Sequence, residues 1–228
     1  MDQIWHDQIE TDVDETTPIS EQDMADLFKE YNSLPEISNS DKEWIDKLGE
    51  ISLRTHIDFP DDYRLKMVHK RIGDGVDWTD SLRIATTEVG SSKRVVFDKS
   101  PNVSILSALA ASSALPGVWP AVKINDNQYF DGGSYSMDNP DLIEDADNVV
   151  VISNNLPIVA PYKTSDLVNQ MNEKGINTTL LVPGKEVVAV LNKYGHNTME
   201  SALRSEVANA AREQGRKDAE KLADLPLK

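Results

Sequence analysis

The hydrophobic residues recur at helical spacing in two stretches near the start of the chain. Residues 20–31 begin with a sequence that resembles a capping box and continue with apolar residues three and four positions apart. Residues 40–51 repeat the capping pattern ahead of a second apolar stripe. The pattern predicts a short helix in the first stretch and a second helix that continues past Gly49, although a glycine costs a helix about 1 kcal/mol relative to alanine.

Beyond residue 80 the apolar pattern becomes that of β-strands. Residues 81–89 and 93–99 are rich in β-branched side chains and flank Gly-Ser-Ser, which predicts two strands joined by a tight connection. Residues 104–115 are alanine-rich and end at Pro-Gly, which predicts a closely packed helix. Apolar pairs on both sides of Asn-Asp-Asn at 125–127 predict a second hairpin, whose last strand ends at Asp131.

The last third of the chain alternates apolar runs with amphipathic stretches. The continuous run at 148–153 fits a strand buried on both faces of a parallel sheet, and residues 176–184 fit another strand. Residues 186–194 and 199–222 have the pattern of helices. Strands that alternate with helices predict an α/β fold with a largely parallel sheet.

Composition describes a globular chain with one domain. Its 228 residues suffice for a substantial core, and 39% hydrophobic with 27% charged residues is not the composition of a disordered chain. Residues 1–20 are acidic, and their apolar residues recur with neither helical nor strand periodicity. We therefore expect a loosely packed arm ahead of a domain that covers residues 21–228. No apolar run approaches the ~18 residues of a membrane span, and the N-terminus does not resemble a secretory signal, so we expect a cytoplasmic location.

Charge and cysteine content narrow the possible chemistry. A net charge of −16 argues against binding nucleic acid or an anionic membrane through the overall electrostatic field of the protein. Small-molecule, neutral-lipid and protein partners remain open. The absence of cysteine removes disulfides, thiolate metal sites and cysteine nucleophiles. The histidines lack the i, i+4 pairing of a helical metal site: His6, His56, His69 and His196.

One acidic group could bind calcium, yet it lacks the alternating ligands and the glycine of an EF-hand loop. Its members are Asp138, Asp141, Glu144, Asp145 and Asp147. A solvated loop and helix start is the simpler interpretation. We therefore expect neither a metal nor another cofactor.

The middle of the chain combines several motifs in a characteristic order. These are AASSALPGVWP at 110–120, VKI at 122–124, YFDGG at 129–133 with Ser136 after it, NPDL at 139–142, VVVI at 149–152 and AAREQG at 210–215. Together they resemble the C-terminal half of bacterial patatin-like phospholipases from about residue 80 to 217, whereas residues 1–79 correspond only in helical character. The resemblance implies an α/β fold in which helices flank a patatin-like sheet, here incomplete on its N-terminal side.

The same resemblance implies a serine hydrolase that acts on lipid acyl esters with a Ser-Asp dyad. In that family the serine lies in a G-x-S-x-G turn, an upstream glycine-rich loop supplies the oxyanion hole, and the aspartate of a D-G-[GA] motif activates the serine. Asp131 matches this aspartate. A serine hydroxyl is a weak nucleophile until a neighbouring base takes its proton, and glycines after the base let another segment approach closely. The three residues D-G-G alone favour a turn, and only the surrounding match indicates a dyad base.

The nucleophile motif itself is absent from the sequence. No two of the 11 glycines lie four positions apart, and the only adjacent pair follows Asp131, so both G-x-S-x-G and the upstream oxyanion loop are missing. By family order both elements would precede residue 1. Other serines are poor substitutes, because none lies on a glycine-flanked turn from strand to helix. Ser112 and Ser113 are expected to pack or cap a helix, and Ser134 and Ser136 to satisfy backbone groups beside the glycines.

Three explanations remain open from sequence. A separate N-terminal fragment could complete the site, the assigned start could be late or the gene interrupted, or catalysis could have been lost. Accordingly the chain is expected to be either a lipid acyl hydrolase subunit with Asp131 as base, inactive alone, or a non-catalytic scaffold or interaction protein with the same fold. A missing first β-α-β unit would leave a bare sheet edge and apolar surface, so we expect an N-terminal partner fragment or a homo-oligomer.

Overall fold

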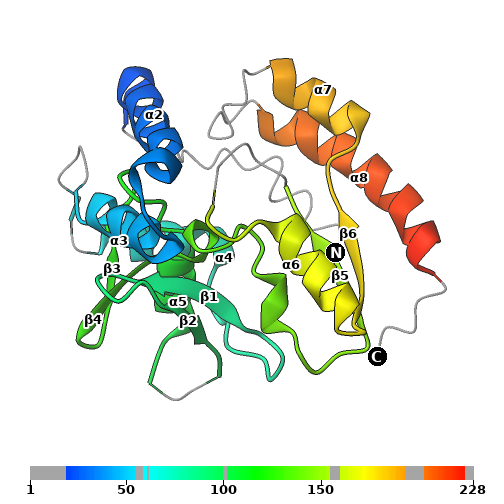
Figure 1. Ribbon diagram of the computed structural model, residues 1–228, viewed down its shortest axis with the longest axis horizontal. Coiled ribbons are helices and arrows are strands. Elements are labelled where there is room, and N and C mark those ends of the chain that lie inside the picture. Colours follow the sequence, from blue (N-terminus) through cyan, green and yellow to red (C-terminus); the bar gives the residue numbers. More distant parts are fainter. Residues whose placement is uncertain are drawn as a thin grey trace. The chain divides into compact units, whose positions relative to one another are not determined.

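The computed structural model describes residues 19–54, 59–60, 62–99, 102–154, 160–193 and 203–223. Of the predicted acidic arm only Ile19 and Ser20 belong to this part, and the rest of the arm lies outside it. The chain forms two compact units, each described separately below (Figure 1). The described part of the larger unit lies within residues 18–142 and 157–167, and that of the smaller unit within 143–156 and 168–228. A single domain over residues 21–228 stays a prediction.

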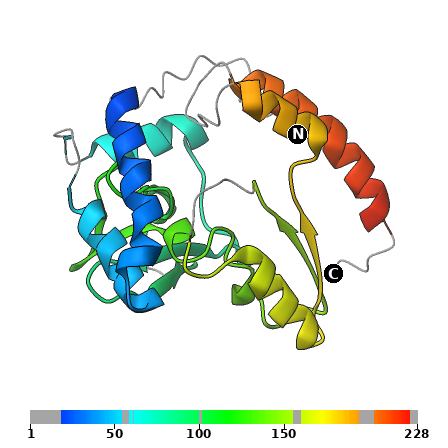
Figure 2. The ribbon, with the colours of Figure 1, turned by 45° about the horizontal axis from the view of Figure 1, so that its top comes forward.

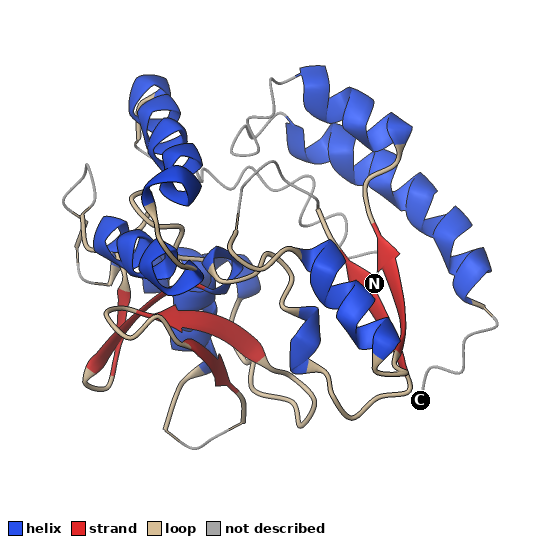
Figure 3. Cartoon of the chain, viewed as in Figure 1, coloured by secondary structure: helices blue, strands red, loops and turns tan. Residues whose placement is uncertain are grey.

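The larger unit contains a four-stranded sheet in the order β2-β1-β4-β3. Its strands are β1 (Ile84–Glu88), β2 (Arg94–Phe97), β3 (Val122–Ile124) and β4 (Asn127–Asp131), shown in red in Figure 3. Both predicted hairpins are confirmed, and every pairing in this sheet is antiparallel. The expectation of a largely parallel sheet is therefore wrong here, because strands joined by a tight turn can pair only in antiparallel fashion.

Serine caps begin three helices of the larger unit. The helices α2 (Glu21–Ile37), α3 (Asp41–Ser52) and α5 (Ile105–Ser112) each follow a serine whose side chain accepts a hydrogen bond from the backbone N–H three residues on. Such a cap satisfies one of the free N–H groups of the first turn. The three predicted helices are thus confirmed, and α2 is longer than expected because it continues through Pro35.

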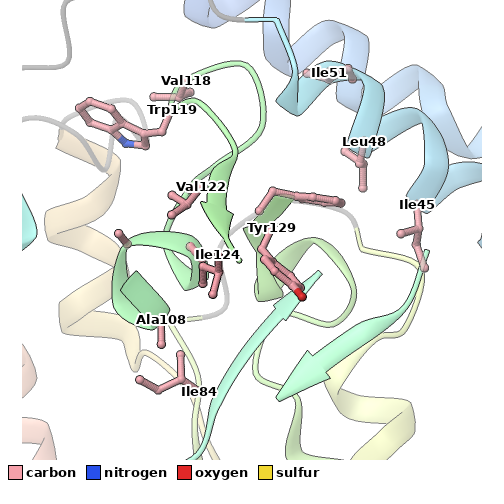
Figure 4. Close-up of a cluster of buried hydrophobic side chains, with 14 of the residues drawn as sticks. Ile45, Leu48, Ile51, Ile84, Ala108, Val118, Trp119, Val122, Ile124 and Tyr129 are labelled. Atoms are coloured by element: carbon pink, nitrogen blue, oxygen red, sulfur yellow. The ribbon is translucent and has the colours of Figure 1, made fainter. Parts of the chain in front are cut away.

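The core of the larger unit lies between these helices and the sheet. Figure 4 shows part of it, with side chains from α3, α5 and the strands gathered together. Phe130 of β4 is fully buried, as are Ala108, Ala110 and Ala111 of α5. Because these alanines are small, α5 contacts β1, β3 and β4 closely, as its composition predicted.

Helix α4 (Tyr63–Ile72) packs against α5 and was not expected from the sequence. Its one buried residue is Val68, and no side-chain hydrogen bond caps its start at Asp62. The cap that begins α2, α3 and α5 is therefore missing from it, although Leu65, Val68 and Ile72 lie at helical spacing.

The smaller unit contains a parallel pair of strands, β5 (Asn148–Ile152) and β6 (Asn177–Leu181). Helix α6 (Thr164–Glu173), which was not expected, lies between them in the chain, as a parallel connection requires. Its Val168 and Met171 cover Val149 and Val151. The prediction that β5 is buried on both faces is wrong for the described residues, because burial alternates along the strand and Ile152 is 79% exposed.

The predicted C-terminal helices are confirmed as α7 (Lys185–Lys193) and α8 (Leu203–Leu222). They lie side by side (Figures 1 and 2). The side-chain amide of Gln214 joins α8 to the start of α7, because it accepts from the Gly184 N–H at 2.7 Å and donates to the Val182 carbonyl at 2.8 Å. Within the described residues, no helix has the length and apolarity needed to cross a bilayer.

Candidate functional site

Asp131 is the last residue of β4, where the sequence predicted the strand to end. Its backbone N–H donates to the Ala114 carbonyl just after α5 at 3.1 Å, and its carbonyl accepts from the Thr87 hydroxyl of β1 at 3.1 Å. The backbone of Asp131 is therefore held from two sides, by the end of a buried helix and by the neighbouring strand.

The carboxylate of Asp131 caps a short turn. Its Oδ1 accepts from the Gly133 N–H at 2.7 Å, and residues Gly132–Ser134 form the single-turn 3-10 helix η1 that this bond begins. A Cβ on Gly132 would lie 2.3 Å from the Ala85 carbonyl oxygen of β1, so no larger residue fits there. The two glycines thus serve a turn that packs directly on the sheet and orients the aspartate.

The surroundings of Asp131 bring the pKa of its carboxyl group closer to neutral pH than that of a free aspartate. Burial raises the pKa of Asp131 from 3.8 to about 6, against the opposing effects of the Gly133 N–H bond and the positive charge of Arg64. A carboxylate with such a pKa is ionised at pH 7 and still accepts a proton readily. Perturbed carboxyl groups of this kind are enriched at functional sites.

Two ionisable groups from other elements face Asp131. Arg64 of α4 acts on Asp131 through its charge, and the negative charge of Asp131 in turn contributes to the raised pKa of Tyr31 on α2, whose main cause is burial. The buried Tyr31 hydroxyl donates to the Pro116 carbonyl. Sequence reasoning missed both residues, because they lie far from Asp131 in the chain and belong to no motif.

The loop after the glycines is held by Asn139. Its side-chain amide donates to the carbonyls of Gly132 at 3.1 Å and Ser136 at 2.6 Å, and its backbone has a φ of 48°, a left-handed conformation that asparagine tolerates. The expectation that Ser136 satisfies backbone groups is wrong, since its hydroxyl has no hydrogen-bond partner among the described residues. The longer asparagine side chain reaches the carbonyls instead.

Arg94 of β2 fastens this loop to the sheet. Its guanidinium donates to both carboxylate oxygens of Asp141 at 2.7 Å and to the Asn139 amide oxygen at 3.1 Å. It also lies 4.8 Å from the ring centre of Tyr135. Paired, planar bonds to a carboxylate fix geometry as well as charge, so the loop that follows Asp131 is firmly placed.

Two of the four serines considered as substitute nucleophiles, Ser113 and Ser136, are engaged or inaccessible in the structure. Ser113 follows α5 and its hydroxyl donates to the Leu109 carbonyl at 2.7 Å, which confirms a capping role, and Ser112 is the last residue of that helix. Ser136 is 0% exposed. Ser134 ends η1.

The acidic and histidine candidates for a metal site have other contacts. Asp141 pairs with Arg94, and Asp138 accepts from the Thr164 hydroxyl at 2.6 Å. His69 is exposed and lies 2.8 Å from Asp74, whereas the other three histidines fall outside the described residues. In the described part of the chain no group of three or more His, Asp or Glu side chains is arranged to hold a metal ion.

Comparison with known proteins identifies the family model that fits the chain. The model of the patatin-like phospholipase family matches residues 17–162, which is more than half of the sequence. The match covers the sheet of the larger unit, Asp131 and the loop that follows it. No curated protein matches the sequence.

Proposed function

Because the chain belongs to the patatin-like phospholipase family, we propose that it takes part in lipid acyl-ester hydrolysis and carries the general base, Asp131, of a Ser-Asp dyad. The observation that supports this role most directly is the state of the Asp131 carboxylate. It stands at the end of β4, is oriented by the Gly133 N–H, and burial raises its pKa to about 6. The match of the family model identifies the class of chemistry, and the carboxylate geometry supports the role of the residue.

The two carboxylate oxygens of Asp131 have different roles in this proposal. Oδ1 accepts from the Gly133 N–H, and among the described residues none donates a hydrogen bond to Oδ2. Oδ2 takes the proton of a serine hydroxyl as the serine oxygen attacks the ester carbonyl. The same proton passes to the leaving alcohol, and an acyl-serine forms. Water, activated by Asp131 in the same way, then releases the fatty acid and restores the serine.

The serine and the oxyanion donors come, in our proposal, from a segment that the given sequence does not contain. The sequence has no G-x-S-x-G, the Ser136 hydroxyl is buried, and that of Ser113 is bonded to Leu109. The same lack of a nucleophile motif favours a second candidate function, a non-catalytic scaffold or interaction protein with the family's fold. Lipid or another acyl ester is the substrate in the first case only.

The test begins with the DNA that precedes the coding sequence. Any upstream segment that encodes G-x-S-x-G is co-expressed with the chain, and hydrolysis of p-nitrophenyl butyrate is measured. We expect turnover only from the pair, and a loss of about 10²–10⁴-fold in Asp131→Asn, which cannot accept the proton. Asp138→Asn is the matched control, because Asp138 lies in the same loop and bonds to Thr164 instead. Turnover that survives Asp131→Asn, or the lack of any such segment, would count against the hydrolase proposal.

For the chain by itself, we expect no measurable hydrolysis of p-nitrophenyl esters and no labelling by a fluorophosphonate probe. The physical reason is that no described serine lies on a glycine-flanked turn beside the Asp131 carboxylate. Turnover that copurifies with the isolated chain and disappears in Asp131→Ala would show that the chain holds its own nucleophile.

A further inference from the structure

Arg64 has an environment that differs from that of the other described arginines. Its guanidinium carbon lies 4.7 Å from the ring centre of the buried Trp119, and its Nε is buried without a hydrogen-bond partner among the described residues. Arg94, by contrast, forms a two-bond ion pair with Asp141. The Arg64 guanidinium is thus partly buried, with its Nε away from solvent and its Nη2 toward Ser113.

The hydrogen bonds of Arg64 lead directly to the backbone that holds Asp131. Its Nη2 donates to the Ser113 carbonyl at 2.9 Å and to the Ser113 hydroxyl at 2.6 Å. The next carbonyl along the chain, that of Ala114, accepts from the Asp131 N–H at 3.1 Å. The Arg64 guanidinium therefore fixes the Ser113–Ala114 backbone, to which the Asp131 N–H is hydrogen-bonded.

Arg64 is also the one cation that acts on Asp131 among the described residues. The other elements packed around Asp131 bring few charges. Helix α5 has no ionisable residue, and β1 has only Glu88, at its far end opposite Tyr129. Helix α2 brings the neutral Tyr31 hydroxyl and the adjacent Glu30, whose charge acts on Tyr31. The Arg64 charge thus has no close competitor in its effect on the carboxylate.

We propose that Arg64 is a positioning residue for the base: it fixes the Ser113–Ala114 backbone that holds Asp131 and places a positive charge beside the Asp131 carboxylate. This inference rests on the proposed role of Asp131 as base. In an assembled site, loss of Arg64 would leave Asp131 protonated over a wider pH range and would move the acidic limb of the pH–rate profile upward. If Arg64 only capped the end of helix α5, its loss would not move the pH–rate profile.

The test measures the Asp131 carboxyl directly and needs no turnover. The chain is labelled with ¹³C-aspartate, the Asp131 signal is assigned from its absence in Asp131→Asn, and its pKa is measured by NMR titration. We expect Arg64→Gln to raise the pKa of Asp131 by about one unit, since the positive charge of Arg64 is one of the causes that lower this pKa. Arg64→Lys, which keeps the charge, should restore the pKa to within a few tenths of the wild-type value. Arg54→Gln, which removes an exposed arginine paired with Glu30, is the matched control and should not change it.

A second measurement covers the case in which Arg64→Gln does not fold. Arg64→Lys keeps the charge but lacks the planar fork, so we expect faster hydrogen exchange at the Asp131 amide with little change in its pKa. An Asp131 pKa that stays the same in Arg64→Gln, or a shift in Arg64→Lys as large as about one unit, would overturn the inference. A confirmed effect of Arg64 together with no hydrolysis by the assembled pair would instead contradict the proposed function alone.

Discussion

The Asp131 carboxyl group caps a turn and, in the proposed function, also acts as the base. As a turn residue it caps η1 through the Gly133 N–H, and this bond fixes which oxygen remains open to another partner. As the proposed base it must stay ionised in a partly buried place, and burial works against that charge. Asn139 and Arg94 secure the loop on the far side of the glycines. The residue is therefore positioned at a cost in stability, as functional groups often are.

Asp131→Asn should make the protein more stable at neutral pH. The pKa of Asp131 is about 6 in the folded chain against 3.8 for the free side chain, so ionisation favours the unfolded chain. The wild type loses stability relative to the variant as the pH rises from about 4 to about 6, and the difference is absent below pH 4. After a discount for solvent access, we expect about 2 kcal/mol at pH 7. Urea unfolding of both proteins at pH 3.5 and pH 7 measures this, and equal stability at both pH values would contradict it.

We expect substitution by alanine to change the free energy of unfolding in opposite directions at Gly132 and Gly215. Gly132→Ala places a Cβ 2.3 Å from the Ala85 carbonyl oxygen, so we expect a loss of about 2–3 kcal/mol in the free energy of unfolding. Gly215→Ala, in the middle of α8 with open space around it, should gain about 0.5–1 kcal/mol. Chemical denaturation compares the two. A Gly132→Ala variant as stable as the wild type would show that β1 and η1 are not in close contact.

At the scale of elements, α5 connects the core to the site. It is only eight residues long, contacts three strands, and is followed by the Ala114 carbonyl that binds the Asp131 N–H. A helix this short is marginal in isolation and depends on its cap and its packing. The close approach of its buried alanines to the sheet gives the helix its fixed position.

Ser104→Ala should therefore weaken α5 measurably. The Ser104 hydroxyl accepts from the Ser107 N–H at 3.0 Å, and loss of such a cap costs about 1 kcal/mol. Ser104→Asp, which restores an acceptor at the helix start, should recover most of this loss. Thermal unfolding of the three proteins gives the comparison, and an unchanged melting temperature in Ser104→Ala would refute the role of the cap.

For the whole molecule, the two units differ in how well their strands are paired. Strand β5 pairs with β6 on one side, and no other described strand pairs with it. A parallel pair of strands is normally covered by apolar packing on its faces. The Ile152 side chain at the end of β5 is nevertheless 79% exposed, so it leaves apolar surface on this strand.

We expect the isolated chain to self-associate through the exposed Ile152 in a concentration-dependent manner. Ile152→Lys should reduce the association, because it replaces exposed apolar surface with a charge. Val76→Lys, at an exposed apolar residue of the larger unit, is the control and should leave it unchanged. Light scattering over a range of concentrations measures both, and a monomeric wild type would contradict the expectation.

The sequence by itself determined most of the local structure. The serine caps, the turn residues of both hairpins and the helical stripes act over a few positions, so α2, α3, α5 and the strands were predicted, as was the place of Asp131 at a strand end. Helices α4 and α6 were missed because each has only ten residues, although both carry apolar residues at helical spacing. The antiparallel sheet was missed because the expectation of parallel strands came from the overall alternation of elements and not from the connections.

Only the tertiary structure decided what surrounds Asp131. Arg64 and Tyr31 lie on separate helices far from Asp131 in the chain, and no local pattern links them to the D-G-G motif. Asn139 lies in the NPDL stretch after the glycines, but its bond to the Gly132 carbonyl is seen only in the folded loop. The pKa of Asp131 likewise depends on burial, which arises when α5, β1 and β4 pack together. The sequence thus identified which residue is a candidate base, and the packing of distant elements set its charge, its orientation and its open oxygen.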